Sequence, residues 1–400
     1  MTTPVPLTSS EDRRALGAAV AGRIAQAPPR VLALGEPMHG EEEFPLVRNA
    51  LFEALVDAAG FTTIALETSA WHGLLVDDYV AGGAGDEDEV IASGFTHDFV
   101  KSAADRELVR WMRERNRDRP ADRRLRFAGF DAPVEMAGAP SPRAALRRLH
   151  DFTRAHVGGS EPVPWALLDR LLGDDARWEE PAAAMEPARS VGSEPRVHEL
   201  RGLVDDLRWA VTCELPHLRR AGTAGLADAL LAGRTAAGVL AYHAAMARDT
   251  DDRWQRLAAI RDAMMAENVE ALAERGRTLV FAHNQHVRTG AAEMAFGTTA
   301  LRWHPAGAHL ADRLGGDYRV VVSALGRADH RDIGEPDPGT VEGVLRALPE
   351  GGHLLDAAGL RALGCAPREP GFNYFPLEDG ILGQADEVLY LRTVTAGAGA

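Results

Sequence analysis

The chain has 400 residues, of which 46% are hydrophobic and 26% charged, and it carries a formal net charge of −15. This composition is typical of a globular protein with one or two domains. The excess of acidic residues argues against a nucleic-acid partner, because binding to phosphate groups requires a basic surface.

The sequence also lacks the marks of a membrane or secretory protein. Its apolar runs are much shorter than the ~20 residues that a membrane-spanning helix needs, and its first residues lack the apolar core of a signal peptide. Cys213 and Cys365 are too isolated for a disulfide framework or a thiolate metal cluster. We therefore expect no membrane partner and a cytoplasmic location, with Cys213 as a small buried side chain in a helix.

Short β-like runs recur along the chain, each flanked by long helical patterns. Several of these runs are apolar throughout, which is typical of strands covered on both faces by helices. Their alternation predicts an α/β fold with a largely parallel sheet flanked by helices. The predicted strands are residues 31–34, 62–66, 125–130, 278–282, 318–323, 353–356 and 387–392.

The pattern changes between the third and fourth predicted strands, where four helices follow one another without a strand. We interpret this region as a helical insertion that forms a lid or a pocket wall, or that simply covers one face of the sheet. The predicted helices are residues 143–156, 165–172, 194–221 and 253–275. The chain thus divides into residues 1–135 as the N-terminal part of the core, 136–275 as the insertion and 276–400 as the C-terminal part of the core.

Acids and histidines gather where the predicted strands end. If the strands are parallel, these ends share one edge of the sheet, and open α/β sheets bind ligands in the crevice outside that edge. We therefore predict a functional site there. The residues concerned are Glu36 and His39 after the first strand, Glu67 at the end of the second, Asp131 at the end of the third, and His283 and His286 after the fourth.

Glu36 and His39 form the most suggestive pair among these residues. Histidine suits general acid–base chemistry because its ordinary pKa lies near neutral pH, and a nearby glutamate can orient the ring and stabilise its charged form. The alternatives are a solvated loop for His39, a turn cap before a proline for Asp131, and an acid near a helix N-terminus for Glu67.

Arg48 lies nine residues beyond His39, two to three turns into the next predicted helix. Its guanidinium group either points back to the crevice, where it would clamp a carboxylate or an oxyanion, or pairs with surface acids. The acids within reach on the same helical pattern are Glu42, Glu43 and Glu53.

Established reaction motifs are missing from the sequence. There is no G-x-S-x-G turn for a serine hydrolase, no phosphate-binding loop or dinucleotide motif, and no H-E-x-x-H helix. What remains is an acid–base site that either activates water directly or binds a metal through His39, His283, His286 and the glutamates.

The segment Leu34-Gly-Glu-Pro-Met-His-Gly40 resembles the opening motif of the erythromycin esterase family. The resemblance continues in the same order along nearly the whole chain, so it does not depend on one motif. The further matching positions are Phe44, Arg48 and residues 60–67, 127–131, 261–268, 282–287, 307–315 and 317–322.

This resemblance implies an α/β core with a large cleft walled by helices, and hydrolysis of a macrolide lactone without a serine nucleophile. It implies that His39 acts as general base on water, with Glu36, Arg48, His283 and His286 as further catalytic residues. We expect a macrolide or another polyketide-like substrate and no cofactor, a divalent metal being the less favoured alternative. The residues expected to bind substrate are Glu67, Asp131, Trp71, His72 and Arg261.

Three segments depart from the family pattern, and all are expected to line the cleft. They are residues 96–101, the pair Trp71-His72, and the segment that follows Arg261. The substrate can therefore differ from a 14-membered macrolide, and the reaction can differ as well. One alternative is a non-hydrolytic cyclase of natural-product biosynthesis that uses the same histidine and glutamate with water excluded. Another is a sequestering protein without turnover, which the intact Glu36 and His39 disfavour.

Overall fold

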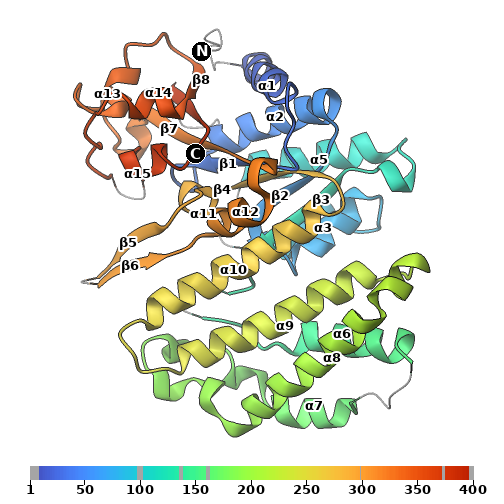
Figure 1. Cartoon of the computed structure of the whole chain (residues 1–400). Coiled ribbons are helices and arrows are strands. Elements are labelled where there is room, and N and C mark those ends of the chain that lie inside the picture. Colours follow the sequence, from blue (N-terminus) through green and yellow to red (C-terminus); the bar gives the residue numbers. More distant parts are fainter. Residues whose placement is uncertain are drawn as a thin grey trace.

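The computed structural model describes residues 9–96, 102–134, 138–158, 163–297, 299–371 and 374–395. Seven strands form one sheet in the order β3-β2-β4-β1-β7-β9-β8, and every neighbouring pair is parallel except β9 and β8 (Figure 1). This confirms the predicted α/β fold and each predicted strand. The strands are β1 (Val31–Glu36), β2 (Phe61–Ser69), β3 (Arg126–Asp131), β4 (Arg277–His283), β7 (Tyr318–Arg327), β8 (Gly352–Asp356) and β9 (Glu387–Thr393).

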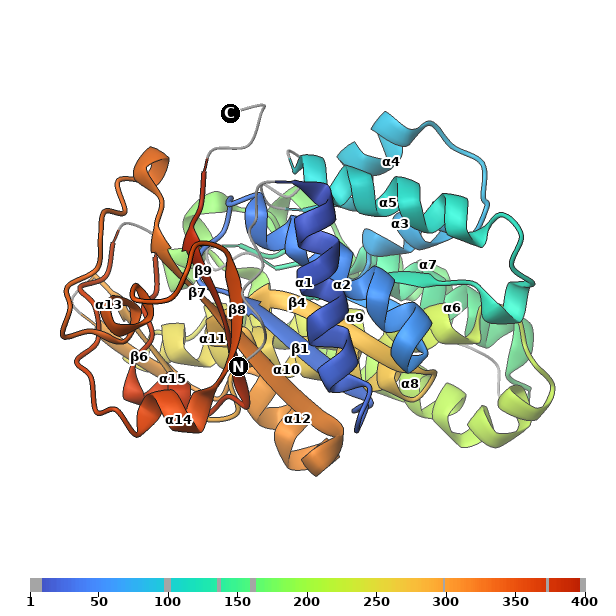
Figure 2. The same cartoon turned by 90° about the horizontal axis from the view of Figure 1, so that it is seen from above.

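Helices cover both faces of this sheet. Successive side chains of a strand point to opposite faces, so Leu32 and Leu34 of β1 pack into one apolar core while Val31 and Ala33 pack into the other. This explains why β1 is apolar throughout. The first face is covered by α1 (Ser10–Ile24), α2 (Glu43–Ala59), α3 (Gly73–Val80), α4 (Glu87–Gly94) and α5 (Ala103–Asn116), and the second by α10 (Arg253–Ala273) and α12 (Ala306–Leu314) (Figure 2).

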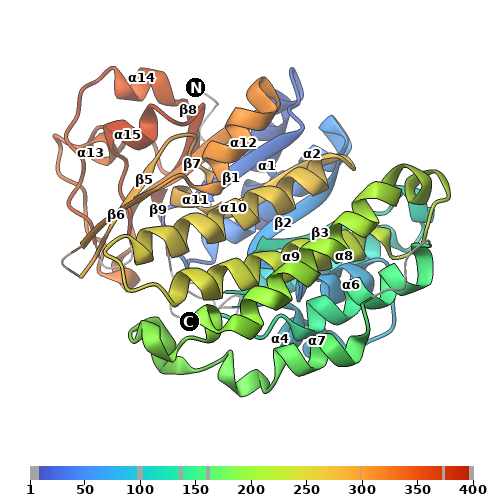
Figure 3. The ribbon, with the colours of Figure 1, turned by 60° about the horizontal axis from the view of Figure 1, so that its bottom comes forward.

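The helices between β3 and β4 form a layer with an apolar core of its own. Helix α9 is its centre, because it contacts α6, α8 and α10 (Figure 3). Helix α10 also packs Met265 and Val269 against the sheet, so it joins the two layers. The other helices of this layer are α6 (Arg143–His156), α7 (Trp165–Leu172), α8 (Pro195–Arg220) and α9 (Leu226–Met246), with 3₁₀ turns between α7 and α8 at Asp175–Arg177, Pro181–Ala184, Pro187–Arg189 and Val191–Ser193.

The C-terminal third completes the sheet and adds short elements around it. A two-stranded antiparallel hairpin, β5 (Ala292–Phe296) and β6 (Thr299–Trp303), packs beside α10. The short helices are α11 (Asn284–Val287), α13 (Val341–Leu345), α14 (Ala357–Arg361) and α15 (Asp379–Leu382). Within the described part of the chain, none of the helices is both long enough and apolar enough to cross a membrane.

Three local features differ from the sequence-based expectations. The prediction of a buried Cys213 was wrong, because this side chain is exposed on α8. Helix α8 buries the face that carries Leu200, Val204, Leu207 and Val211, and position 213 lies off that face. Helix α9 and the β5–β6 hairpin were not predicted.

Candidate active site

Two of the predicted site residues are held together by the central strands of the sheet. Glu36 ends β1 and is paired in register with His283 at the end of the neighbouring strand β4. Between them the backbone of β1 approaches α11 closely, because a Cβ on Gly35 would lie 2.3 Å from Oδ1 of Asn284. The Asn284 amide in turn donates to the Ser323 carbonyl at 2.8 Å and accepts from the Ser323 N–H at 3.0 Å, which fixes α11 against β7.

His39 lies between two buried carboxylates. Its Nδ1 is 2.7 Å from Oε1 of Glu36, and its Nε2 is 3.7 Å from Oε1 of Glu67. The Glu36 and Glu67 side chains are only 1% and 4% exposed, whereas 48% of the His39 side chain is exposed. The histidine is therefore the group through which solvent reaches this pair of carboxylates.

The Glu67 carboxylate lies within 4 Å of three side chains that are or can become positively charged, namely His39, His286 and Arg261. Its Oε2 accepts from the backbone N–H of His283 at 2.7 Å, and its Oε1 lies 3.4 Å from Nε2 of His286 and 3.5 Å from Nη2 of Arg261. Burial alone raises the pKa of the Glu67 carboxyl, but His286, His39 and Arg261 together bring it well below its usual range. Glu67 is therefore ionised at neutral pH.

Arg261 and His286 are each oriented by a second buried carboxylate. Arg261 donates to Asp131 at 2.9 Å from Nε and 2.6 Å from Nη2, a bidentate pair. His286 Nδ1 lies 2.8 Å from Oδ1 of Asp262, which also accepts from the indole N–H of Trp303 at 2.7 Å on its other oxygen.

Together these groups form what we term the acid–base cluster. Sequence reasoning did not include Asp262 or Trp303 among the site residues, although Asp262 follows Arg261 directly in a segment that matches the family pattern. The members of the cluster are Glu36, His39, Glu67, Asp131, Arg261, Asp262, His283 and His286.

The histidines of this cluster differ in charge because their surroundings differ. Burial lowers the pKa of His39, but the carboxylates of Glu67 and Glu36 outweigh it and raise the pKa to about 9. Burial likewise lowers the pKa of His286, and Asp262 and Glu67 reverse the direction, so that its pKa is raised.

The pKa of His283 is shifted in the opposite direction. Burial and the neighbouring His39 lower its pKa to about 3, so its ring is neutral. Its Nδ1 accepts from the N–H of Gln285 at 3.2 Å, which leaves the ring proton on Nε2. The ring centroids of His283 and His39 are 5.2 Å apart. Burial also raises the pKa of Glu36, against the opposing effect of His39.

Arg48 occupies neither of the two positions expected from the sequence. Its side chain is 1% exposed, and its Nη1 lies 2.8 Å from Oδ1 of Asp105, which is equally buried. Its guanidinium lies 4.9 Å from the ring centroid of Phe281. The alternative of pairing with a surface glutamate was wrong, because the carboxylate that pairs with Arg48 is the buried Asp105 of α5. The positive charge of Arg48 still favours the ionised form of Glu36.

Trp71 and His72 follow β2 and line cavities beside the cluster. A cavity of about 610 Å³ is lined by both, together with α6, α7 and α9 side chains such as Arg147 and Trp165. A second, of about 330 Å³, is lined by His72, Ser69 and residues that follow β3. None of the described histidines of the acid–base cluster lines either cavity. Residues 97–101 of the segment that departs from the family pattern lie outside the described residues.

Over the described ranges, no set of three or more histidine, cysteine, aspartate or glutamate side chains is arranged to hold a metal ion. In the acid–base cluster the carboxylate oxygens already face cations or N–H groups. Glu67 accepts from His283 and faces His286 and Arg261, while Asp131 binds Arg261 in a bidentate manner.

The chain belongs to the erythromycin esterase family, whose sequence profile matches residues 56–394. An erythromycin esterase type II of Escherichia coli is 32% identical over 125 residues, a segment that covers 31% of this chain and 28% of that protein. The match to that relative therefore spans less than a third of its length.

Solved structures with the same fold include a protein from Bacillus cereus, with a TM-score of 0.72 and 16% identity over 98% of this chain and 95% of that one. A succinoglycan biosynthesis protein has a TM-score of 0.69 and 18% identity over 98% and 95% of the two chains. A mutant of the erythromycin esterase EreC in its open conformation has a TM-score of 0.67 and 16% identity over 100% and 99%. At these identities the likeness establishes the fold alone.

The family match begins at residue 56, after Glu36, His39 and Arg48. Glu36 and His39 therefore lie outside the matched range. The structure nevertheless places the His39 ring beside Glu67 and His283, which lie within that range. Whether Glu67, Asp131, Trp71, His72 and Arg261 contact a substrate stays a prediction.

Proposed function

We propose that this protein hydrolyses an ester bond in a small molecule, either a macrolactone or a related polyketide-like ester, with His39 as the general base. The observation that carries the proposal is the position of His39, half exposed between the buried carboxylates of Glu36 and Glu67. A basic group that solvent can reach, and whose charged form is stabilised by two buried carboxylates, is suited to removing a proton from water.

The reaction would begin with His39 in its neutral form. Its Nδ1–H donates to Glu36, which leaves Nε2 free of its proton and able to accept one from a water molecule. As the water oxygen bonds to the ester carbonyl carbon, Glu36 and Glu67 stabilise the imidazolium that forms. The tetrahedral intermediate then loses its alkoxide, which takes the proton from His39. The products are an acid and an alcohol.

Positive charge near the developing oxyanion would come from His286 and Arg261. Their side chains are 12% and 17% exposed, so both reach the surface of the crevice. Fixed charges of this kind typically contribute a few kcal/mol to transition-state stabilisation. Arg48 would act indirectly, by favouring the charged form of Glu36 from a buried position. The bulk of the substrate would extend into the cavities beside Trp71 and His72.

The test is to incubate the purified protein with erythromycin and with p-nitrophenyl esters and to follow the products by mass spectrometry. The proposal expects a product heavier by one water, and a loss of about 10²–10⁴-fold in kcat/KM for His39→Ala. His309→Ala, which alters a histidine on α12 outside the cluster, is the matched control and should keep wild-type turnover. Equal turnover by wild type and His39→Ala would remove the proposed base.

We also propose that the reaction needs no metal, because the cluster carboxylates already neutralise Arg261, His286 and His39. The same assay after dialysis against a chelator should give unchanged turnover. Loss of turnover that Zn²⁺ or Mn²⁺ restores would overturn this part of the proposal.

A further inference from the structure

A third cavity lies where the helical insertion meets the edge of the sheet, and we term it the junction cavity. It has a volume of about 380 Å³ and lies between the edge strand β3, α3, and the facing ends of α8, α9 and α10. No member of the acid–base cluster lines it. Much of its wall is apolar, with contributions from Leu74, Leu226, Leu231 and Leu272.

The carboxylates that line the junction cavity all have arginine partners. Asp77 accepts a hydrogen bond from Nε of Arg126 at 2.9 Å on one carboxylate oxygen. Nη2 of Arg126 donates to the other oxygen. Asp228 pairs with Arg148 on α6, and Glu274 lies 3.0 Å from Arg219. None of these acids is therefore available to neutralise another arginine without giving up its own partner.

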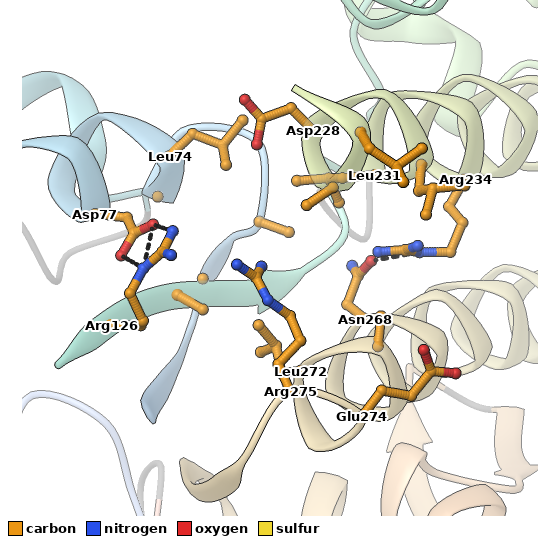
Figure 4. Close-up of a pocket in the computed structure, with 18 of the residues that line it drawn as sticks. Leu74, Asp77, Arg126, Asp228, Leu231, Arg234, Asn268, Leu272, Glu274 and Arg275 are labelled. Carbon is orange, nitrogen blue, oxygen red and sulfur yellow. Dashed lines mark hydrogen bonds and ion pairs between the residues drawn. The ribbon is translucent and has the colours of Figure 1, made fainter. Parts of the chain in front are cut away.

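Two further arginines line the same cavity and have no carboxylate partner among the described residues. Nε of Arg234 donates to the neutral amide oxygen of Asn268 at 3.2 Å, and Arg275, just beyond the end of α10, forms no ion pair with any residue that the structure describes. Figure 4 shows the Arg275 guanidinium in the space between the Asp77–Arg126 pair and the Arg234–Asn268 pair.

Desolvation without a compensating acid leaves the Arg234 guanidinium group at a disadvantage, whereas Arg275 is exposed and lacks only an acidic partner within the described part of the chain. Burial lowers the pKa of Arg234, with Arg208 acting in the same direction and Glu267, Glu270 and Glu274 opposing from beyond ion-pair distance. Partial desolvation, followed by the charge of Arg126, lowers the pKa of the exposed Arg275, and the charges of Asp77 and Asp228 act in the opposite direction. An anion placed beside both groups would relieve this cost.

We propose that the junction cavity binds a small amphipathic carboxylate, with its carboxylate beside Arg275 and Arg234 and its apolar chain along the leucines. Four arginines against three carboxylates line the cavity, so its local charge is positive in a chain of net charge −15. Planar guanidinium groups recognise carboxylates through paired N–H donors, and the leucine wall selects an apolar body over a small inorganic anion.

This site is separate from the reaction proposed above and does not depend on it. Both regions draw residues from α10, but Asn268 lies seven positions after Arg261, about 10 Å along a helix axis. The Asn268 side chain also donates to the Phe130 carbonyl of β3 at 3.1 Å, which holds the cavity wall against the sheet.

The test is isothermal titration calorimetry of the full chain with octanoate, with 1-octanol and with inorganic phosphate. The proposal expects saturable binding of one octanoate, and binding of octanol and phosphate at least tenfold weaker. Arg275→Gln and Arg234→Gln should each weaken octanoate binding at least tenfold. Arg256→Gln, an exposed arginine on α10 far from the cavity, and His39→Ala should leave it unchanged. Arg275 is exposed, so its variant should fold even if the variant of the half-buried Arg234 does not.

Three results would overturn the proposal. One is octanoate binding that Arg275→Gln does not weaken, or that His39→Ala abolishes instead. Another is equal affinity for octanol, which would leave the arginines without a role. The third is equal affinity for phosphate, which would leave the apolar wall without one.

Discussion

The acid–base cluster and the Arg48–Asp105 ion pair are two groups of paired charges that differ in their access to solvent. The acid–base cluster reaches solvent through His39, whose side chain is 48% exposed, whereas Arg48 and Asp105 are each 1% exposed. Both groups pair carboxylates with cations near β1. We therefore expect a reactive role for the accessible member of the cluster and a structural role for the sealed Arg48–Asp105 pair.

The two groups should therefore fail in different ways when they are altered. Removing the accessible base His39 takes away a reacting group, while the buried carboxylates of Glu67 and Asp131 keep their pairs with His286 and Arg261. Removing one partner of a sealed ion pair leaves an uncompensated charge in the interior, which destabilises the fold.

The largest effect on stability is expected for Arg48→Ala. Asp105 would lose its partner while fully buried, and the free energy of unfolding should fall by about 3–5 kcal/mol. Denaturant unfolding measures this. The matched control is Arg13→Ala, whose partly exposed pair with Glu43 should contribute less than about 1 kcal/mol. Equal small losses for both variants would show that the sealed pair is not structural.

The next largest effect is expected for Glu36→Gln. The amide oxygen can still accept the His39 Nδ1–H, so the ring orientation is kept while the charge is lost. We expect the plateau of kcat/KM to fall roughly tenfold, since a weaker base removes the proton less readily. Because Glu36 raises the pKa of His39, the pH at which the rate levels off should move to lower values. An unmoved profile would mean that Glu36 does not act on the titrating group.

A smaller effect is expected for Trp303→Phe, which removes the indole N–H that holds Asp262. Asp262 keeps its bonds to His286 and to the Ala306 N–H. A hydrogen bond to a charged acceptor contributes about 1.5–3 kcal/mol. Part of this loss should appear as a few-fold decrease in kcat, with KM little changed. A change in KM alone would place Trp303 in substrate binding instead.

The sheet and the residues at its carboxyl edge could be predicted from local sequence pattern. Parallel strands bring their carboxyl ends to one edge, so Glu36, Glu67, Asp131 and His283 could be placed together before their contacts were known. Helix α9 was not predicted because it is apolar on nearly every side and so lacks the periodic pattern of a surface helix.

Contacts between distant segments could not be predicted in the same way. Asp105 lies 57 positions from Arg48, and Trp303 lies 41 positions from Asp262 on a hairpin with no strong strand pattern. The junction cavity combines α3, β3 and three helices, so its unpaired arginines become evident only when the partners of every neighbouring acid are known.

The central claim is that His39, held between Glu36 and Glu67, is the base. The measurement that tests it most directly is the pH dependence of kcat/KM, which reports the pKa of the essential group in the free enzyme. Since the base must be neutral and its pKa is raised to about 9, kcat/KM should rise with pH up to about 9 and then level off, with the midpoint lowered in Glu36→Gln. A midpoint near 6.5, the ordinary value for histidine, or a flat profile between pH 6 and 9 in both proteins would contradict the account.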